Sequence, residues 1–171
     1  YPIYFGGNIF GKAGLLIRKN LPEVKKICVI YDSKLPKKLL KKLIKSLKKY
    51  DLKIYKLSSN EKNKNLFTAN KIIENLLKDN FNRSDCVLAF GGGIIGDVSA
   101  FISSVTKRGL KFVNIPTTLL SQVDASVGGK TGVNSTHGKN LIGTFYQPDF
   151  VISDISILKS LPHREMVSGY G

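Results

Sequence analysis

The chain contains the run Asp85-Cys86-Val87-Leu88-Ala89-Phe90-Gly91-Gly92-Gly93-Ile94-Ile95-Gly96, in which a buried-strand pattern leads directly into a glycine cluster. The cluster fits G-x-G-x-x-G between a strand and a helix, which is the context of a dinucleotide-binding loop. Glycine lets the backbone approach a pyrophosphate closely, and the N-terminus of the next helix offers unpaired N–H groups. A plain tight turn is the alternative interpretation, and the loop alone does not decide between the two.

Strand and helix patterns alternate on both sides of this run. Apolar or β-branched segments predict strands at 26–31, 53–57, 85–90, 111–115 and 150–153. Apolar residues at helical spacing predict helices at 34–49, 66–77, 98–106 and 117–127, whereas 128–148 has no clean period. This order predicts an α/β domain with a mostly parallel sheet and flanking helices. Asp32, Gly91 and Thr117 then fall at or just after strand ends, where such folds bind ligands.

The acidic residue that usually holds the ribose in this motif is missing. It is expected about 20 residues after the loop, yet no acidic residue lies between Asp97 and Asp124. If a dinucleotide binds here, Asp32 and Glu61 are the acidic residues available at strand ends or in loops.

A second polar segment follows the glycine cluster. It reads Gln122-Val123-Asp124-Ala125-Ser126-Val127-Gly128-Gly129-Lys130-Thr131-Gly132-Val133-Asn134, with Lys139-Asn140 shortly after it. Two lysines, an asparagine and several glycines can surround an oxyanion with donors, and Asp124 can orient a hydroxyl. The segment is not a Walker loop, because Asp124 stands where that motif has its first glycine. A solvated loop is the alternative for this segment, and helix capping is the alternative for Pro116-Thr117-Thr118.

The net charge of +15 is unevenly distributed. Residues 1–90 hold 20 lysines and arginines against 7 acids, whereas residues 91–171 hold 7 against 5. Much of the excess falls on 34–49, which predicts an amphipathic helix with a solvated lysine face. No nucleic-acid module is recognisable, so binding of nucleic acid is not expected.

Other composition features narrow the class of protein. No apolar run approaches the ~20 residues of a membrane span, so no membrane partner is expected. Cys28 and Cys86 sit in strand-like runs and are expected to be buried thiols, which favours a cytoplasmic protein. His137 and His163 are in no metal-ligand spacing, so no complete metal site is expected in this chain.

Taken together, the motifs resemble the 3-dehydroquinate synthase family. The ordered matches are Gly91-Gly92-Gly93-Ile94-Ile95-Gly96-Asp97, Lys107-Arg108-Gly109, Ile115-Pro116-Thr117-Thr118-Leu119-Leu120-Ser121-Gln122-Val123-Asp124, Ser126-Val127-Gly128-Gly129-Lys130-Thr131, Gly138-Lys139-Asn140-Leu141-Ile142-Gly143, Phe145-Tyr146-Gln147-Pro148, Leu158-Lys159-Ser160-Leu161-Pro162 and Arg164-Glu165. They cover about half of the chain, and the first 80 residues match more loosely.

The resemblance implies two domains. A Rossmann-like NAD-binding α/β domain would occupy residues 1–160, and residues 161–171 would begin a C-terminal helical domain that holds a divalent metal, zinc or cobalt. It also implies a homodimer and a reaction, the conversion of 3-deoxy-D-arabino-heptulosonate 7-phosphate to 3-dehydroquinate and phosphate with transient oxidation by NAD⁺.

Site residues are implied position by position. The cofactor would be held by Asp32, Glu61, Lys64, Gly93, Ile94, Ile95, Gly96, Asp97, Thr117, Thr118, Lys130, Lys139, Leu158, Lys159 and Ser160. The substrate's hydroxyls, carboxylate or phosphate would meet Asp124, Lys130, Lys139 and Asn140. Arg108 would reach the phosphate bound in a neighbouring subunit.

Two departures from the family pattern affect these expectations. Ser59-Asn60 precedes Glu61 where the family usually has Asp-Gly, and the chain ends at Gly171, one position before the family's first metal ligand. We therefore expect this piece to bind NAD weakly and to be inactive alone. Another sugar phosphate cyclase, or a non-catalytic NAD-binding or basic interaction module, remains the alternative; metal-dependent glycerol dehydrogenases share only the Gly-Gly-Gly turn.

Overall fold

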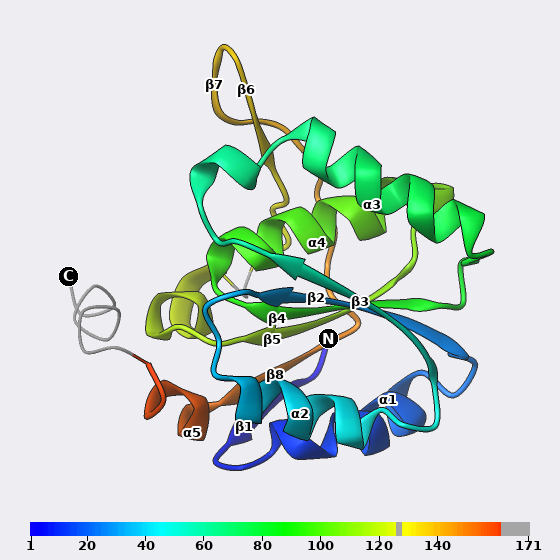
Figure 1. The fold of residues 1–171 in the computed structure, drawn as a ribbon, viewed down its shortest axis with the longest axis vertical. Coiled ribbons are helices and arrows are strands. Elements are labelled where there is room, and N and C mark those ends of the chain that lie inside the picture. The colour runs from blue at the N-terminus through cyan, green and yellow to red at the C-terminus, as the bar shows by residue number, and fades with distance from the viewer. Residues whose placement is uncertain (126–127, 162–171) are drawn as a thin grey trace.

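A computed structural model, which describes residues 1–125 and 128–161, has a parallel sheet between two layers of helices (Figure 1). The six strands are arranged in the order β1-β8-β5-β4-β2-β3. Their bounds are Ile3–Gly6 for β1, Lys26–Asp32 for β2, Asp51–Leu57 for β3, Cys86–Gly91 for β4, Lys111–Pro116 for β5 and Phe150–Asp154 for β8. All pairings within the sheet are parallel. The predicted α/β class is therefore confirmed.

Helices cover both faces of the sheet. The 3-10 turn η1 (Phe10–Lys12) and helices α1 (Ala13–Asn20), α2 (Lys37–Ser46) and α5 (Ile155–Leu158) contribute to the hydrophobic cluster on one face. Helices α3 (Leu66–Lys78) and α4 (Gly93–Val105) pack on the opposite face (Figure 1). No helix within the described residues is long and apolar enough to cross a bilayer.

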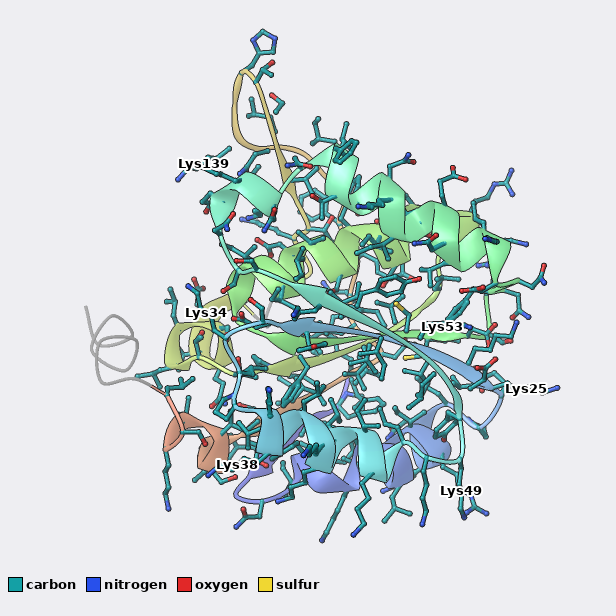
Figure 2. All side chains as sticks on the ribbon, viewed as in Figure 1. Lys25, Lys34, Lys38, Lys49, Lys53 and Lys139 are labelled. Atoms are coloured by element: carbon teal, nitrogen blue, oxygen red, sulfur yellow. The ribbon has the colours of Figure 1, made fainter. Side chains whose placement is uncertain are left out.

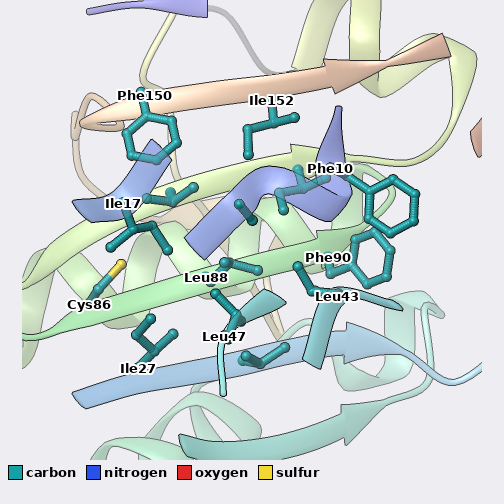
Figure 3. Close-up of a cluster of buried hydrophobic side chains, with 14 of the residues drawn as sticks. Phe10, Ile17, Ile27, Leu43, Leu47, Cys86, Leu88, Phe90, Phe150 and Ile152 are labelled. Carbon is teal, nitrogen blue, oxygen red and sulfur yellow. The ribbon is translucent and has the colours of Figure 1, made fainter. Parts of the chain in front are cut away.

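Strand β4 is the centre of both cores. All six of its residues are buried, as expected for a central parallel strand with helices on each side. Leu88 and Phe90 point to the face where Phe10, Leu43 and Leu47 pack (Figure 3). Phe10 stacks on Phe90 with ring centroids 5.6 Å apart. Burial of one such side chain stabilises the fold by about 1.5–3 kcal/mol.

The cysteines take the buried positions that the sequence predicts. Cys28 and Cys86 are free thiols with no exposed surface, on opposite faces of the sheet. Burial raises the pKa of both thiols, so they stay protonated and act as small apolar side chains.

Helix α2 has the amphipathic pattern that its sequence predicts. Leu39 and Leu43 are buried, while most of its lysines face solvent (Figure 2). Lys42 lies over the ring of Phe10, with 4.9 Å between Nζ and the ring centroid. Within residues 1–125 and 128–161, no α2 lysine forms an ion pair.

The predicted strands are confirmed to within two residues at each end, but three helices differ, and α2 is three residues shorter at each end than the predicted 34–49. Helix α4 begins at Gly93 rather than residue 98, because the glycine cluster already forms its first turn. The helix predicted at 117–127 is shorter and of another type: Ser121–Ala125 form the π-helical turn η4, and residues 126–127 lie outside the described part. Thr118 and Ser121 cap this turn reciprocally, each hydroxyl accepting the other's backbone N–H.

Several elements were not predicted, among them the short helix α5. Strand β1 and helix α1 lie in the first twenty residues, and the aperiodic segment 128–148 contains an antiparallel hairpin of β6 (Val133–Ser135) and β7 (Gly138–Ile142). This hairpin projects beyond α3 and α4 (Figure 1).

Candidate functional site

The first cleft lies at the carboxyl ends of β2 and β4, where the connections that leave the two neighbouring strands cross opposite faces of the sheet. After β2 the chain crosses one face through α2 to β3, and after β4 it crosses the opposite face through α4 to β5. Parallel sheets bind ligands at such a switch point. A cleft of about 260 Å³ is found there, lined by Asp32, Lys34, Ser59, Gly92, Gly93, Ile94, Thr118 and Leu120.

The glycine loop forms the floor of this cleft. A Cβ atom on Gly91 would lie 2.5 Å from Cγ1 of Ile95, so the tight passage from β4 into α4 excludes a side chain. Thr117 is almost fully buried and donates its N–H to the carbonyl of Gly91 at 2.9 Å. Gly92 provides no side-chain cap, and no acidic residue occupies the first turn of α4. The free N–H groups and the helix dipole therefore favour an anion.

Asp32 supplies a carboxylate at the edge of the first cleft. It ends β2, and its Oδ1 accepts the backbone N–H of Lys34 at 2.9 Å. The side chain is mostly buried yet borders the cleft, so its orientation is fixed. A carboxylate at this place can accept hydrogen bonds from the hydroxyls of a ribose.

The second cleft lies between α4 and the segment that carries the hairpin. It has a volume of about 370 Å³ and is lined by Asp97, Lys130, Thr131, Gly132, Asn140, Leu141, Gly143, Thr144 and Phe145. The structure thus brings together Asp97, Lys130 and Asn140, which lie far apart in the sequence. A lysine, an amide and a hydroxyl beside one carboxylate suit a small, polar, anionic ligand.

Asp97 is paired with a buried lysine. Lys64 Nζ lies 2.6 Å from Asp97 Oδ2, and the Lys64 side chain is 5% exposed against 29% for Asp97. Burial raises the pKa of Asp97, although the hydrogen bond and charge of Lys64 act in the opposite direction, and Glu61 adds to the increase. The Lys64 ammonium therefore limits the increase in the pKa of a carboxyl that borders the second cleft.

Polar contacts hold the hairpin against the loop before α3. Asn134 donates its N–H to the carbonyl of Lys64 at 2.8 Å and its amide to Glu61 Oε2 at 2.7 Å. Asn134 Oδ1 accepts the N–H of Asn140, whose φ of 58° is left-handed. Glu61 therefore supports the hairpin and borders neither cleft, whereas Asp32, the other acid expected at the ribose, borders the first.

Several expected site residues lie apart from both clefts. Asp124 is exposed in η4, and Lys139 extends outward from the hairpin (Figure 2). Residues Leu158, Lys159 and Ser160 follow β8 at the carboxyl edge of the sheet. Arg108 lies just beyond the C-terminal end of α4, toward the amino edge of the sheet. The length of α4, about 20 Å, separates it from the glycine loop. Arg164 and Glu165 lie outside the described residues.

Sequence reasoning missed several residues that border the clefts. Lys34 and Ser59 follow the ends of β2 and β3, so strand-end position alone would have indicated them. Thr144 and Phe145 come from the aperiodic segment, which gave no signal for the hairpin that brings them to the second cleft.

Comparison with known proteins identifies the family. The family model described as 3-dehydroquinate synthase N-terminal matches residues 54–168. The chain is 54% identical to the 3-dehydroquinate synthase of Pelagibacter ubique over its whole length, which is 46% of that protein. It is 42% identical to the enzyme of Alkaliphilus metalliredigens, again over the whole chain and 47% of the relative. The chain thus spans about half the length of these relatives.

Solved structures agree with this assignment. A crystal structure of 2-deoxy-scyllo-inosose synthase, complexed with carbaglucose-6-phosphate, NAD⁺ and Co²⁺, superposes with a TM-score of 0.89 at 29% identity. The match covers 98% of this chain and 46% of that one. A probable glycerol dehydrogenase from Sinorhizobium meliloti shares the fold alone, with a TM-score of 0.77 at 18% identity over 98% of this chain and 43% of that one. The chain belongs to the 3-dehydroquinate synthase family and matches the family's N-terminal region.

Proposed function

We propose that this chain is the NAD-binding part of a 3-dehydroquinate synthase, which converts 3-deoxy-D-arabino-heptulosonate 7-phosphate to 3-dehydroquinate and phosphate. One observation carries the proposal: the two clefts flank the first turns of α4. Gly93 and Ile94 border the first cleft, and Asp97 borders the second. A dinucleotide in one cleft and a phosphorylated sugar acid in the other would meet at the same helix N-terminus.

The first cleft fits the dinucleotide. Gly92 and Gly93 bring backbone without side chains to the cleft, the N-terminus of α4 is uncapped by side chains, and Asp32 stands at the cleft edge. These features suit, in order, close approach of a pyrophosphate, its negative charge and a ribose hydroxyl. When bound, NAD⁺ supplies an acceptor for the hydride of a ring alcohol and returns that hydride later. A related synthase at 29% identity binds NAD⁺ in its crystal structure, which supports this assignment.

The second cleft suits the substrate. Lys130 offers a cation and Asn140 offers an amide donor, so a carboxylate or a departing phosphate would be held where negative charge develops. Lys139 and Asp124 belong to the proposal as further substrate-binding groups on the same side of the molecule. Glu61, Lys64, Thr117 and residues 158–160 complete the proposed cofactor site around the carboxyl edge.

Arg108 is assigned to a second subunit. It follows the C-terminal end of α4 and borders neither cleft of its own chain, and the proposal has it serve a substrate across the interface of a homodimer. The proposal also places the enzyme in the cytoplasm and gives it no nucleic-acid or membrane partner.

The metal is assigned outside the described residues. Residues 1–125 and 128–161 contain no group of three His, Cys, Asp or Glu side chains that could hold one. We therefore derive no catalytic step from a metal on these residues. The Co²⁺ in the related synthase supports a divalent ion, zinc or cobalt, held by residues in the half of the relatives that this chain does not match.

Phosphate release tests the function. This chain, joined to the second half of the Pelagibacter ubique enzyme, is mixed with NAD⁺, zinc and heptulosonate phosphate, and inorganic phosphate is followed over time. NAD⁺-dependent release supports the proposal, and Lys130→Met should lower it at least a hundredfold because a cation at the developing charge is lost. Absence of release, with the joined protein folded and NAD⁺ bound, would contradict it.

A second cyclase activity is favoured by one observation. The inosose synthase, crystallised with a carbocyclic glucose 6-phosphate analogue, superposes closely on this chain. The same assay with glucose 6-phosphate in place of the heptulosonate separates the two. Turnover of glucose 6-phosphate alone would replace the dehydroquinate assignment.

A further inference from the structure

The segment 143–147 lies between two parts of the molecule that carry proposed substrate-binding cations. On one side it pairs with the strand of Lys130: Tyr146 donates its N–H to the carbonyl of Gly129 at 2.6 Å, and Thr131 donates to Thr144 at 2.9 Å. On the other side Thr144 donates its hydroxyl to Ser104 of α4 at 2.8 Å. The segment therefore holds the wall of the second cleft against α4.

The turn after α4 has an unusual backbone. Lys107, Arg108 and Gly109 have consecutive φ values of 51°, 62° and 126°. Left-handed φ is unfavourable for residues with a side chain, so two of them in succession require support from outside the turn. Gly109 donates its N–H to Thr106 at 2.9 Å, and the next residue, Leu110, donates to Ser103 at 2.8 Å. The conformation leaves the side chains of Lys107 and Arg108 exposed.

Tyr146 supplies support from outside the turn. Its hydroxyl donates a hydrogen bond to the carbonyl of Leu110. A Cβ atom on Gly109 would lie 3.0 Å from that hydroxyl oxygen, so the ring tip and the turn are in contact. Burial raises the pKa of Tyr146, which keeps the phenol protonated and able to donate. One residue thus bonds to the Lys130 strand through its backbone and to the Arg108 turn through its side chain.

We propose that Tyr146 is a positioning residue that couples the Lys130 wall of the second cleft to the turn that presents Arg108. The inference rests on the proposed function, in which Lys130 meets substrate in its own subunit and Arg108 meets it in the partner subunit. In that arrangement Tyr146 connects the two substrate sites of a dimer. A ligand that displaces the cleft wall therefore changes the position of the exposed Arg108 side chain. A contact that displaces Arg108 moves the cleft wall in the same way.

Amide hydrogen exchange in the 171-residue chain tests the coupling without any substrate. Tyr146→Phe keeps the ring and removes the hydroxyl. It should speed exchange about fivefold or more both at Leu110 and at Thr131, as expected when one hydrogen bond is lost. Tyr4→Phe is the matched control, because the Tyr4 hydroxyl is also half-buried and bonded, to Asn20, far from both elements. Acceleration at Leu110 alone, or equal acceleration by the control variant at both amides, would overturn the coupling.

A second variant approaches the same contact from the turn. Gly109→Ala places a methyl group against the Tyr146 hydroxyl and also strains the turn, because φ is 126° there; both effects should shift the amide resonances of Thr131 and Lys130. The shift should fall roughly twofold or more when Tyr146 is already Phe, because the coupled contact is gone. Equal shifts in both backgrounds would show that the turn reaches Lys130 by another route and would sink the proposal.

Kinetics of the joined enzyme distinguish this inference from the function on which it rests. Tyr146→Phe should raise KM for the phosphorylated substrate about fivefold and leave KM for NAD⁺ unchanged, because only the second cleft is displaced. An equal rise in both KM values would count against a positioning role. If the joined protein releases no phosphate at all, the proposed function fails, while the exchange experiments still decide the coupling.

Discussion

The glycine loop borders the first cleft and the hairpin segment borders the second, and the two regions are built in different ways. The loop 91–97 joins a fully buried central strand to a thirteen-residue helix, so the sheet and the core fix its course. The hairpin segment 130–146 stands at the margin of the sheet. Val133 anchors it in the core, and polar bonds to Glu61, Lys64 and Ser104 hold it at the surface. The first cleft thus lies on a firmly held part of the fold, whereas the wall of the second cleft can move at lower cost.

The largest effect is expected from the loop. Gly91→Ala forces a Cβ atom to within 2.7 Å of Ile95 Cβ, which cannot shift without moving α4. We expect a loss of about 2 kcal/mol in the free energy of unfolding, measured in urea, together with weaker NAD⁺ binding. Gly7→Ala is the control, since its new Cβ atom would meet Ile155 at an ordinary 3.8 Å. A Gly91→Ala loss no larger than the control's would show that the loop is not rigid.

The second largest effect is expected from the ion pair of Lys64 and Asp97. Lys64→Met removes the partner of Asp97 and leaves a partly buried carboxylate, which should cost about 1–2 kcal/mol of unfolding free energy. The surface pair of Lys53 and Asp79, 3.9 Å apart, offers the comparison: Lys53→Met should cost less than about 0.5 kcal/mol. Equal costs for the two substitutions would contradict a special role for the Lys64 pair.

The hairpin should respond locally. Asn134→Ala removes the hydrogen bond that the Asn134 amide donates to Glu61 and the one that it accepts from the Asn140 N–H. We expect a loss of about 1 kcal/mol in the free energy of unfolding. Amide exchange should rise across β6 and β7, while the amides of β4 keep their protection. Uniform acceleration over the whole chain would mean that the hairpin and the sheet unfold together, and the contrast between the two regions would be wrong.

The smallest expected effect is a dependence of the unfolding free energy on pH that arises from Asp97. Because the pKa of this carboxyl in the folded chain is raised above its ordinary 3.8, the fold binds its proton more tightly than the unfolded chain does. Its stabilising contribution is therefore complete below pH 3.8 and is lost as the pH rises through the folded pKa. Unfolding free energies of the native chain and of Asp97→Asn, measured from pH 3 to 7, should diverge in that window. Parallel curves would exclude the raised pKa.

The same contrast explains what the sequence could predict. The course of β4 into α4 follows from a local pattern, an apolar run and then glycines, and the position of Asp32 follows from the rule that parallel strands end at one edge. The hairpin gave no periodic signal because its course depends on long-range polar bonds, such as Asn134 to Lys64 and Thr131 to Thr144. Asp97 and Lys130 were expected in one site only through the family resemblance, since no spacing in the sequence relates them.

Some residues resisted prediction for a further reason. Glu61 stays a proposed cofactor residue, and nothing in the sequence indicated that its carboxylate would also accept the amide of Asn134 in the hairpin. The apolar spacing at 117–127 predicted a helix that begins at 117. In the structure Thr118 and Ser121 cap each other's backbone, so the turn begins later, and Ser121–Ala125 form a π-helix. Both outcomes depend on individual hydrogen bonds rather than on composition.

The central claim is that two ligand clefts meet at the N-terminus of α4. Titration of the ¹⁵N-labelled chain with NAD⁺, followed by amide chemical shifts, tests it most directly. Saturable shifts should appear at Asp32, Gly92, Gly93 and Ile94 and stay absent from α2, and a subsequent addition of inorganic phosphate should move Lys130 and Asn140. Shifts confined to the lysine face of α2, or no saturable shift at the glycine loop, would contradict the account.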